Sequence, residues 1–303
     1  MTEPVILCCG EAVMDLVPAA LPDGGHGFRP VPGGAAVNTA IALARQDVPC
    51  SFVGALSNDP MGIRLFAHIQ TQGVDLSHVT RSPAPTTVAL AHVVDGGTRF
   101  DLYDQGSAGR SYATTDLPDL PNSVQALVIG GISLIHAPAA DAFETLASQA
   151  AHDHLIYLDL NIRPGLVSDQ STYRARLSRL IKLADIIKVS DEDLDWFGPL
   201  PDLQADTLLL HTKGADGVTA VSGQDSYTIS APLVEVQDTV GAGDIFNAGF
   251  LAALYRQDAL EKPLLVAPNI LKSALHSGIQ AASFSVSHPG AHAPTRQDLT
   301  CAH

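Results

Sequence analysis

The feature that most limits the fold of this chain is a series of short, continuous apolar runs. They are VILCC (5–9), SFVGAL (51–56), ALVIGGI (126–132), LIYLDL (155–160), DIIKV (185–189) and TLLLHT (207–212). Runs that are apolar at every position, and not only at every second one, indicate strands that are covered on both faces. Because helical stretches separate most of these runs, the pattern predicts the α/β class, with a mostly parallel central sheet and helices on both of its faces.

Two segments depart from this pattern. Residues 12–33 and 86–111 contain alternating pieces, such as TTVALAHVV and TRFDLY, together with GG and PDGG turns. Alternation of this kind suits strands that expose one face. Since the sequence contains no internal repeat and no long linker, we expect a single domain over residues 1–303 that carries these two segments as a small β lid.

Composition excludes several classes of protein. A formal net charge of -15 disfavours binding to nucleic acid or to anionic membranes, so an anionic ligand needs a locally built site. The N-terminal stretch has no basic residue before its short apolar run, and no stretch reaches the length of a membrane span. The cysteines at positions 8, 9, 50 and 301 lack metal-binding spacing, which favours free thiols. We therefore expect a cytoplasmic protein.

Polar residues and glycines follow the apolar runs directly. They are Gly10, Glu11, Asp15, Asn58, Asp59, His136, Asn161, Arg163, Ser190, Asp191, Glu192, Asp193, Thr212, Lys213 and Gly214. In an open parallel sheet the ligand crevice lies beyond the carboxyl ends of the strands, so these residues are predicted to meet at one edge. The alternative for each residue is an ordinary polar loop.

The segment GGAAVNTAIALAR (33–45) places Gly33 and Gly34 before a helix that carries Asn38. Paired glycines allow the backbone to approach a ligand closely, and an asparagine amide can both donate to and accept from a hydroxyl. These properties suit a sugar. A tight turn followed by a closely packed, alanine-rich helix is the competing interpretation.

The segment DTVGAGDIFNAG (238–249) puts Gly241, Ala242 and Gly243 directly before Asp244 and an apolar helix. Backbone N–H groups of such a loop, together with the positive end of the helix, make an anion site that suits a phosphate. Neither GxxxxGK[ST] nor a dinucleotide fingerprint is present. The competing interpretation is that Asp244 only caps the helix.

Taken together, the two glycine segments resemble the paired signatures of the PfkB, or ribokinase-like, family of carbohydrate kinases. The resemblance covers essentially the whole chain, and its motifs occur in the expected order. Within the family the chain is most similar to bacterial fructokinases, through Gly10-Glu11, Asp15, PTTVALAHVVDGGTRFDLYDQGSA (85–108) and DLNIRP (159–164). The resemblance implies a ribokinase-like three-layer sandwich with a β lid, and an ATP-dependent transfer of phosphate to a sugar hydroxyl.

The resemblance also implies roles for individual residues. The sugar would be bound by Asp15, Gly33, Gly34, Asn38 and Asp244, and Asn161 and Arg163 would lie near the sugar or the transferred phosphate. Asp244 would be the catalytic base, and Gly241, Ala242 and Gly243 would supply N–H groups to the developing charge. ATP would be contacted by Ser190, Thr212, Gly214, Gly217, Gly241 and Gly243, with the helix that leads to SFSVSHPGA (283–291) beside the adenine. Asp238 and the loop at 285–290 match the region where relatives hold a monovalent cation such as K⁺.

One segment departs from the family pattern. Many relatives have N-x-x-E, associated with magnesium, where this chain has Ser190, Asp191, Glu192 and Asp193. Carboxylates remain, so Mg²⁺ linked through water is still expected, chiefly as a companion of ATP, but no ligand is assigned.

Three further expectations concern mechanism and assembly. The helix N-terminus is expected to keep Asp244 ionised and to make it a weak base. The lid is expected to close over the sugar and exclude water. Its exposed strands favour a homodimer joined lid to lid.

Two alternatives to a fructokinase stay open. One is another kinase of the same family, acting on 2-keto-3-deoxygluconate, ribose or a nucleoside. The other is a sugar-binding regulatory protein that has lost the chemistry, although the intact Gly241–Asp244 run argues against it.

Overall fold

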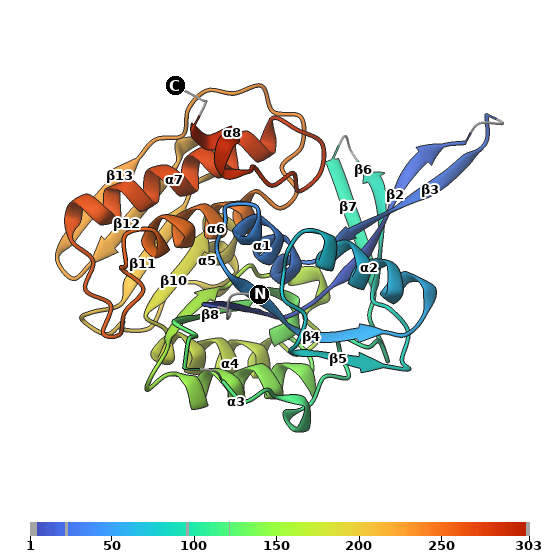
Figure 1. Ribbon diagram of the computed structural model, residues 1–303, viewed down its shortest axis with the longest axis horizontal. Coiled ribbons are helices and arrows are strands. Elements are labelled where there is room, and N and C mark those ends of the chain that lie inside the picture. The colour runs from blue at the N-terminus through green and yellow to red at the C-terminus, as the bar shows by residue number, and fades with distance from the viewer. Residues whose placement is uncertain (1–4, 22–23, 95–96, 121, 301–303) are drawn as a thin grey trace.

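A nine-stranded sheet forms the centre of the molecule, with strand order β13-β12-β11-β10-β9-β8-β1-β4-β5 (Figure 1). The computed structural model describes residues 5–21, 24–94, 97–120 and 122–300. Neighbours from β11 to β5 are parallel, and β12 and β13 are antiparallel to the strands beside them. The strands are β1 (Ile6–Cys9), β4 (Cys50–Ser57), β5 (Val79–Ser82), β8 (Ala126–Gly130), β9 (Leu155–Asp159), β10 (Ile186–Ser190), β11 (Leu208–Thr212), β12 (Val218–Ser222) and β13 (Asp225–Ile229).

Helices cover both faces of this sheet. One hydrophobic cluster contains Ile6 and Cys8 of β1 and packs under α1, α2, α6 and α7. A second contains Leu7 and Cys9 and packs under α3, α4 and α5. The helices are α1 (Ala35–Ala44), α2 (Pro60–Thr71), α3 (Ala139–Ala150), α4 (Gln170–Leu183), α5 (Asp191–Phe197), α6 (Ala242–Tyr255), α7 (Pro268–Val286) and the short α8 (Arg296–Thr300). Successive side chains of a strand point to opposite faces, which explains why the central runs are apolar throughout.

The six apolar runs all form strands of this sheet, as β1, β4, β8, β9, β10 and β11, so the predicted α/β architecture is confirmed. Strands β5, β12 and β13 were not among the predicted ones. Their burial is only partial, and polar residues alternate along them, so they lack the continuous apolar signal of the central strands.

Four strands form a second, smaller sheet, called the small sheet below, in the order β3-β2-β6-β7. It is built from β2 (Val13–Ala20), β3 (His26–Gly33), β6 (Val88–Val94) and β7 (Gly97–Tyr103), all within the two alternating segments. Figure 1 shows it projecting from one side of the main sheet. β2 follows β1 after only a few residues, and β3 leads directly into α1. The β2–β3 hairpin of the small sheet is therefore joined to the main domain between the end of β1 and the start of α1.

The described cysteines Cys8, Cys9 and Cys50 are free and buried, whereas Cys301 lies outside the described residues. Burial raises the pKa of the Cys50 thiol to about 12, so this side chain packs as a small apolar group. Among the helices within the described ranges, none is long and apolar enough to cross a membrane.

Close packing of α6 against α7 fixes the helix that carries Asp244. A β-carbon at Gly249 of α6 would lie 2.7 Å from the Ala281 β-carbon and 2.7 Å from the Ser277 carbonyl oxygen of α7. Such contacts are shorter than van der Waals separation, so only glycine allows the two helices to approach this closely.

Gly249→Ala should therefore force α6 and α7 apart and lower the free energy of unfolding by about 1–3 kcal/mol. The matched control is Gly165→Ala, because no atom lies within 4 Å of a β-carbon at Gly165. That change should stay within about 0.5 kcal/mol. Urea titration followed by circular dichroism measures both values. Equal losses for the two variants would contradict the packing argument.

Candidate active site

The loop before α6 is held open by an unusual backbone conformation. Gly241 is the N-cap residue of α6 and has a left-handed φ of 74°. A β-carbon there would lie 2.4 Å from the Ala291 β-carbon, so the position excludes a side chain both by conformation and by space. The N–H groups of the first helical turn have no partner within the helix, and that of Ala242 donates to the Thr239 carbonyl of the loop at 3.3 Å.

Asp244 lies in the first turn of α6 and is buried, with 7% of its surface exposed. Its carboxylate Oδ2 accepts a hydrogen bond of 2.9 Å from the Asn38 amide Nδ2, and its carbonyl accepts one of 3.3 Å from the Thr39 hydroxyl. Asn38 and Thr39 belong to α1, which packs against α6. The two glycine segments, far apart in the sequence, therefore form one site.

Burial raises the pKa of Asp244 to about 7, because the ionised form loses its solvation. The Asn38 hydrogen bond lowers the pKa, nearby Asp159 raises it, and Lys188 and Arg163 lower it. The raised pKa makes Asp244 a stronger base than a free aspartate, so the sequence-based expectation of a weak base is wrong. The helix N-terminus favours the carboxylate by about 0.3–1 kcal/mol, up to ~2 when partly buried, which is too little to offset the desolvation. Asp244 is instead suited to exchange a proton near neutral pH.

The glycine pair before α1 lies beside two carboxylates. A β-carbon at Gly33 would lie 2.3 Å from Asp15 Oδ2, so the space that a side chain would fill is occupied by the Asp15 carboxylate. Burial raises the pKa of Asp15 to about 6. Glu11 accepts a hydrogen bond of 3.0 Å from the Ala35 N–H and another from the Ser133 hydroxyl. Since Gly34 has no side chain, the Glu11 carboxylate takes the place of an N-cap for α1.

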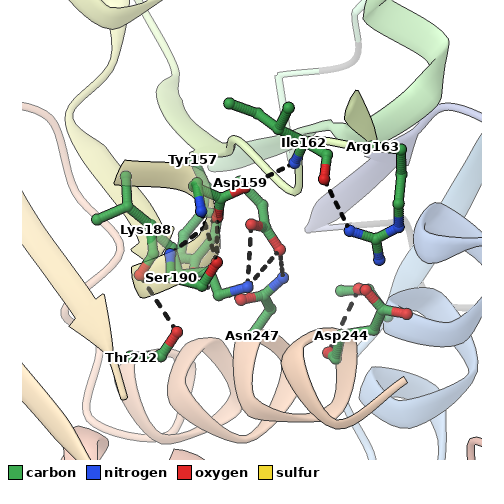
Figure 2. Close-up of polar contacts among 12 residues, drawn as sticks. Tyr157, Asp159, Ile162, Arg163, Lys188, Ser190, Thr212, Asp244 and Asn247 are labelled. Atoms are coloured by element: carbon green, nitrogen blue, oxygen red, sulfur yellow. Dashed lines mark hydrogen bonds and ion pairs between the residues drawn. The ribbon is translucent and has the colours of Figure 1, made fainter. Parts of the chain in front are cut away.

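Asn161 and Arg163 follow β9 and approach the same place. Asn161 has a left-handed φ of 40°, which is uncommon outside glycine, and its amide lies near Gly131 at the end of β8. The Arg163 guanidinium donates a 3.1 Å hydrogen bond to the Ile162 carbonyl. In Figure 2 the guanidinium points toward Asp244. A cation and a carboxylate thus face the region in front of the glycine loop.

The residues at 190–193, which replace the N-x-x-E pattern, form a closed capping box. The Ser190 hydroxyl donates to Asp193 Oδ2 at 2.8 Å and accepts from the Asp193 N–H at 3.2 Å. Asp193 Oδ1 accepts from the Ile162 N–H at 2.7 Å. Both side chains are therefore occupied in joining α5 to the loop after β9. Asp191 pairs with His211 at 2.7 Å.

The residues predicted to contact a nucleotide lie at the ends of β10 and β11. The Thr212 hydroxyl donates to the Val189 carbonyl at 3.2 Å. The turn after it closes through the Lys213 N–H and the Gly217 carbonyl, at 2.8 Å, with Gly214 and Gly217 in left-handed conformations. This turn follows β11, the strand next to β10. It lies away from β1, β4 and β8, the strands that α1 contacts.

Asp238 is joined to the loop at 285–290. Its two oxygens accept from the Val240 N–H at 3.0 Å and from the Gly290 N–H at 2.9 Å. The Val286 carbonyl accepts from the Gln237 and Asp238 N–H groups. Ser285 at the end of α7 has a buried hydroxyl without a hydrogen-bond partner among the described residues. Carboxylate, carbonyl and hydroxyl oxygens are the donor set that a hard cation requires.

A buried ionic network beneath the loop was missed by the sequence analysis. The Lys188 ammonium of β10 lies 3.0 Å and 3.1 Å from the two oxygens of Asp159 at the end of β9. Asn247 of α6 donates to Asp159 at 2.7 Å and accepts from the Tyr157 hydroxyl at 2.8 Å (Figure 2). The available signal was Lys188 within DIIKV, a run predicted to form a strand that is covered on both faces.

Comparisons with known proteins identify the family of the chain. The family model described as pfkB family carbohydrate kinase matches residues 4–298. The chain is 42% identical over 267 residues to the fructokinase of Rhizobium leguminosarum bv. trifolii, covering 85% of this chain and 82% of that protein. It is 30% identical to the aminoimidazole riboside kinase of Salmonella typhimurium, covering 84% and 82%.

Among solved structures, the ATP-bound fructokinase of Xylella fastidiosa superposes with a TM-score of 0.87 at 26% identity, covering 98% of this chain and 97% of that one. The expected ribokinase-like fold is thereby confirmed, and so is the resemblance drawn from the two glycine segments. The chain belongs to the pfkB family of carbohydrate kinases.

Proposed function

We propose that this carbohydrate kinase uses ATP to phosphorylate fructose. The observation that carries the proposal is the hydrogen bond between Asn38 and Asp244. It places an amide that can bind a sugar hydroxyl beside a base with a pKa of about 7, at the end of the glycine loop. The fructokinase relative at 42% identity supports fructose as the acceptor. The ATP-bound structure of the Xylella fastidiosa fructokinase supports the donor.

Phosphoryl transfer requires in-line positioning and stabilisation of negative charge more than covalent chemistry by the protein. In our proposal the N–H groups of Gly241, Ala242 and Gly243 face the moving phosphoryl group, and Arg163 neutralises part of its charge. Asp244 accepts the proton from the attacking sugar hydroxyl. A positioned base of this kind contributes about 10²- to 10⁴-fold in rate.

The sugar is proposed to lie between the small sheet and α1. Asp15, Gly33, Gly34 and Asn38 would bind its hydroxyls from that side, and Asn161 from the end of β9. The small sheet would then act as a lid on a single catalytic domain, excluding water that would otherwise compete for the phosphate.

The nucleotide is proposed to lie along the ends of β10 and β11, near Thr212, Gly214 and Gly217. Ser190, whose hydroxyl is used in the capping box, would contribute at most through its position. Mg²⁺ would neutralise ATP phosphate charge, with no protein ligand assigned, because Asp193 is committed to the cap. Asp238 and the loop at 285–290 would hold K⁺. We place the enzyme in the cytoplasm, where ATP is available, which cell fractionation checks.

A nucleoside kinase is the second candidate, supported by the aminoimidazole riboside kinase relative at 30% identity. Kinases of ribose or 2-keto-3-deoxygluconate share the same proposed chemistry, and exposed Arg163 could pair with an acid sugar. A binding protein without activity is disfavoured by the assembled Asn38–Asp244 pair.

An acceptor panel in an assay coupled to ADP formation tests the proposal. Fructose should give the highest kcat/KM, ahead of ribose, aminoimidazole riboside and 2-keto-3-deoxygluconate. Activity should disappear with EDTA, and it should fall when K⁺ is replaced by tetramethylammonium. A preference for a nucleoside or acid sugar would overturn fructose, and sugar binding without ADP formation would identify a regulatory protein.

The pH dependence follows from the burial of Asp244. Its folded pKa is raised to about 7, and the base must be deprotonated to act, so kcat/KM for the preferred sugar should fall by about tenfold per pH unit below this value. Steady-state rates between pH 5 and 9, in buffers of constant ionic strength, measure this limb. A rate that stays constant down to pH 5 would show that Asp244 is not the base, or that its site is hydrated.

A homodimer through the small sheet is proposed from its exposed apolar side chains. Phe28 on β3 is 52% exposed and Tyr103 on β7 is 61% exposed, and these are the outer strands of the small sheet. Sedimentation velocity should give twice the monomer mass, shifting toward the monomer in Phe28→Ser. Leu265→Ser, at an 82% exposed position outside the small sheet, is the control. A monomer at all concentrations would contradict the proposal.

A further inference from the structure

Lys188 and Asp159 form an ion pair that is almost completely buried. The side chains of both residues are only 6% exposed, and the ammonium lies 3.0 Å from Asp159 Oδ1. The pair stands at the carboxyl ends of β10 and β9, below the first turns of α6. Asn247 connects it to that helix by donating to Asp159 Oδ2 at 2.7 Å.

The pair also lies directly against the glycine loop. A β-carbon at Gly243 would be 2.8 Å from the Lys188 Nζ atom, so the ammonium fills the space beneath that residue. A cavity of about 20 Å³, room for about one water molecule, is lined by Asp159, Asn161, Asp244 and Asn247 together with residues of α1 and β8. The two buried carboxylates therefore line the same partly open pocket.

Stability alone does not account for such a pair. Removing two charges from water costs several kcal/mol per ion, and well-packed apolar residues at the same place are often as stable or more stable. The positions of the two residues in apolar runs would allow that replacement. The buried charges instead occur at the edge of the sheet where the glycine loop and Asp244 lie.

We propose that Lys188 is a positioning residue for phosphoryl transfer, an inference that rests on the proposed function. Held by Asp159 beneath Gly243, its ammonium supports the glycine loop. It also offsets the effect of the Asp159 negative charge on Asp244. Lys188 lies beneath Gly243 with its ammonium held by Asp159, so it acts through these neighbours. Its charge is of the sign that the loop requires when a phosphoryl group passes above it.

The charged groups around Asp244 determine the direction of each effect. Asp159 of β9 raises the proton affinity of Asp244, and Lys188 of β10 and Arg163 after β9 lower it. Lys188 in turn faces Asp159, Asp244 and Asp193 of α5, and its own pKa is raised, so it stays charged over the working range. Removing Lys188 and removing Asp159 should therefore change Asp244 in opposite directions.

The test compares Lys188→Met, Asp159→Asn and the double variant, each close to the shape of the original side chain. The acidic limb of kcat/KM for fructose should move up by about 1 pH unit in K188M and down by about 1 unit in D159N. In the double variant it should return close to the wild-type position. K188M should also lose about 10- to 100-fold in kcat, with KM for the sugar hardly changed.

The matched control is Lys262→Met, which removes the lysine of another Lys–Asp pair on the same sheet. Lys262 lies 2.9 Å from Asp185, which directly precedes β10 and so lies at the amino end of that strand. Its loss should lower the melting temperature without moving the pH limb. A purely structural role for Lys188 would give the same result in K188M, and this outcome would overturn the proposal.

If K188M does not fold, D159N and the double variant still decide the question. A limb that does not move down in D159N overturns the proposal, and one that moves down and is restored in the double variant supports it. Wild-type protein that phosphorylates no sugar would refute the proposed function separately. The coupling would then be judged from the titration of Asp244 by carbon-13 NMR in the same variants, where identical titrations would overturn it.

Discussion

Burial of the Asp244 carboxylate in the first turn of α6 is the constraint on which the rest of the structure depends. The carboxylate is stabilised there by the Asn38 amide and by the cations Lys188 and Arg163, and each comes from a different element. Holding these groups together requires α1 to pack on α6, and β9 and β10 to end below it. The parallel sheet meets this requirement because the carboxyl ends of its strands lie along one edge. Gly249 allows α7 to pack closely against α6 and hold it in place.

Two electrostatic effects compete at Asp244, and their magnitudes decide its chemistry. The helix N-terminus stabilises an anion by at most ~2 kcal/mol. Desolvation acts in the opposite direction and is larger, so the pKa of Asp244 is raised to about 7. Burial therefore makes Asp244 a base that can gain or lose a proton near neutral pH, and it places this base at the start of α6, beside the proposed anion site.

The sequence was sufficient for the fold because continuous apolar runs have few solutions other than a covered sheet, and alternation marked the small sheet. It could not, by periodicity, place Asn38 against Asp244, because no local pattern specifies a contact across more than two hundred residues; the family resemblance supplied that pairing. The pairing of Lys188 with Asp159 was missed because the two residues belong to separate runs, and only the packed sheet brings them together as an ion pair. The proton affinity of Asp244 was misjudged because burial is a property of the packed structure.

Asp244→Asn tests the central claim most directly, since it keeps the shape and removes only the ability to accept a proton. Because ionisation of Asp244 in the folded state is opposed by burial, the variant should be at least as stable as the wild type above pH 7. Calorimetry should show unchanged fructose binding, while turnover should fall by about 10²- to 10⁴-fold. Turnover close to that of the wild type, in a folded variant that binds the sugar, would contradict the account.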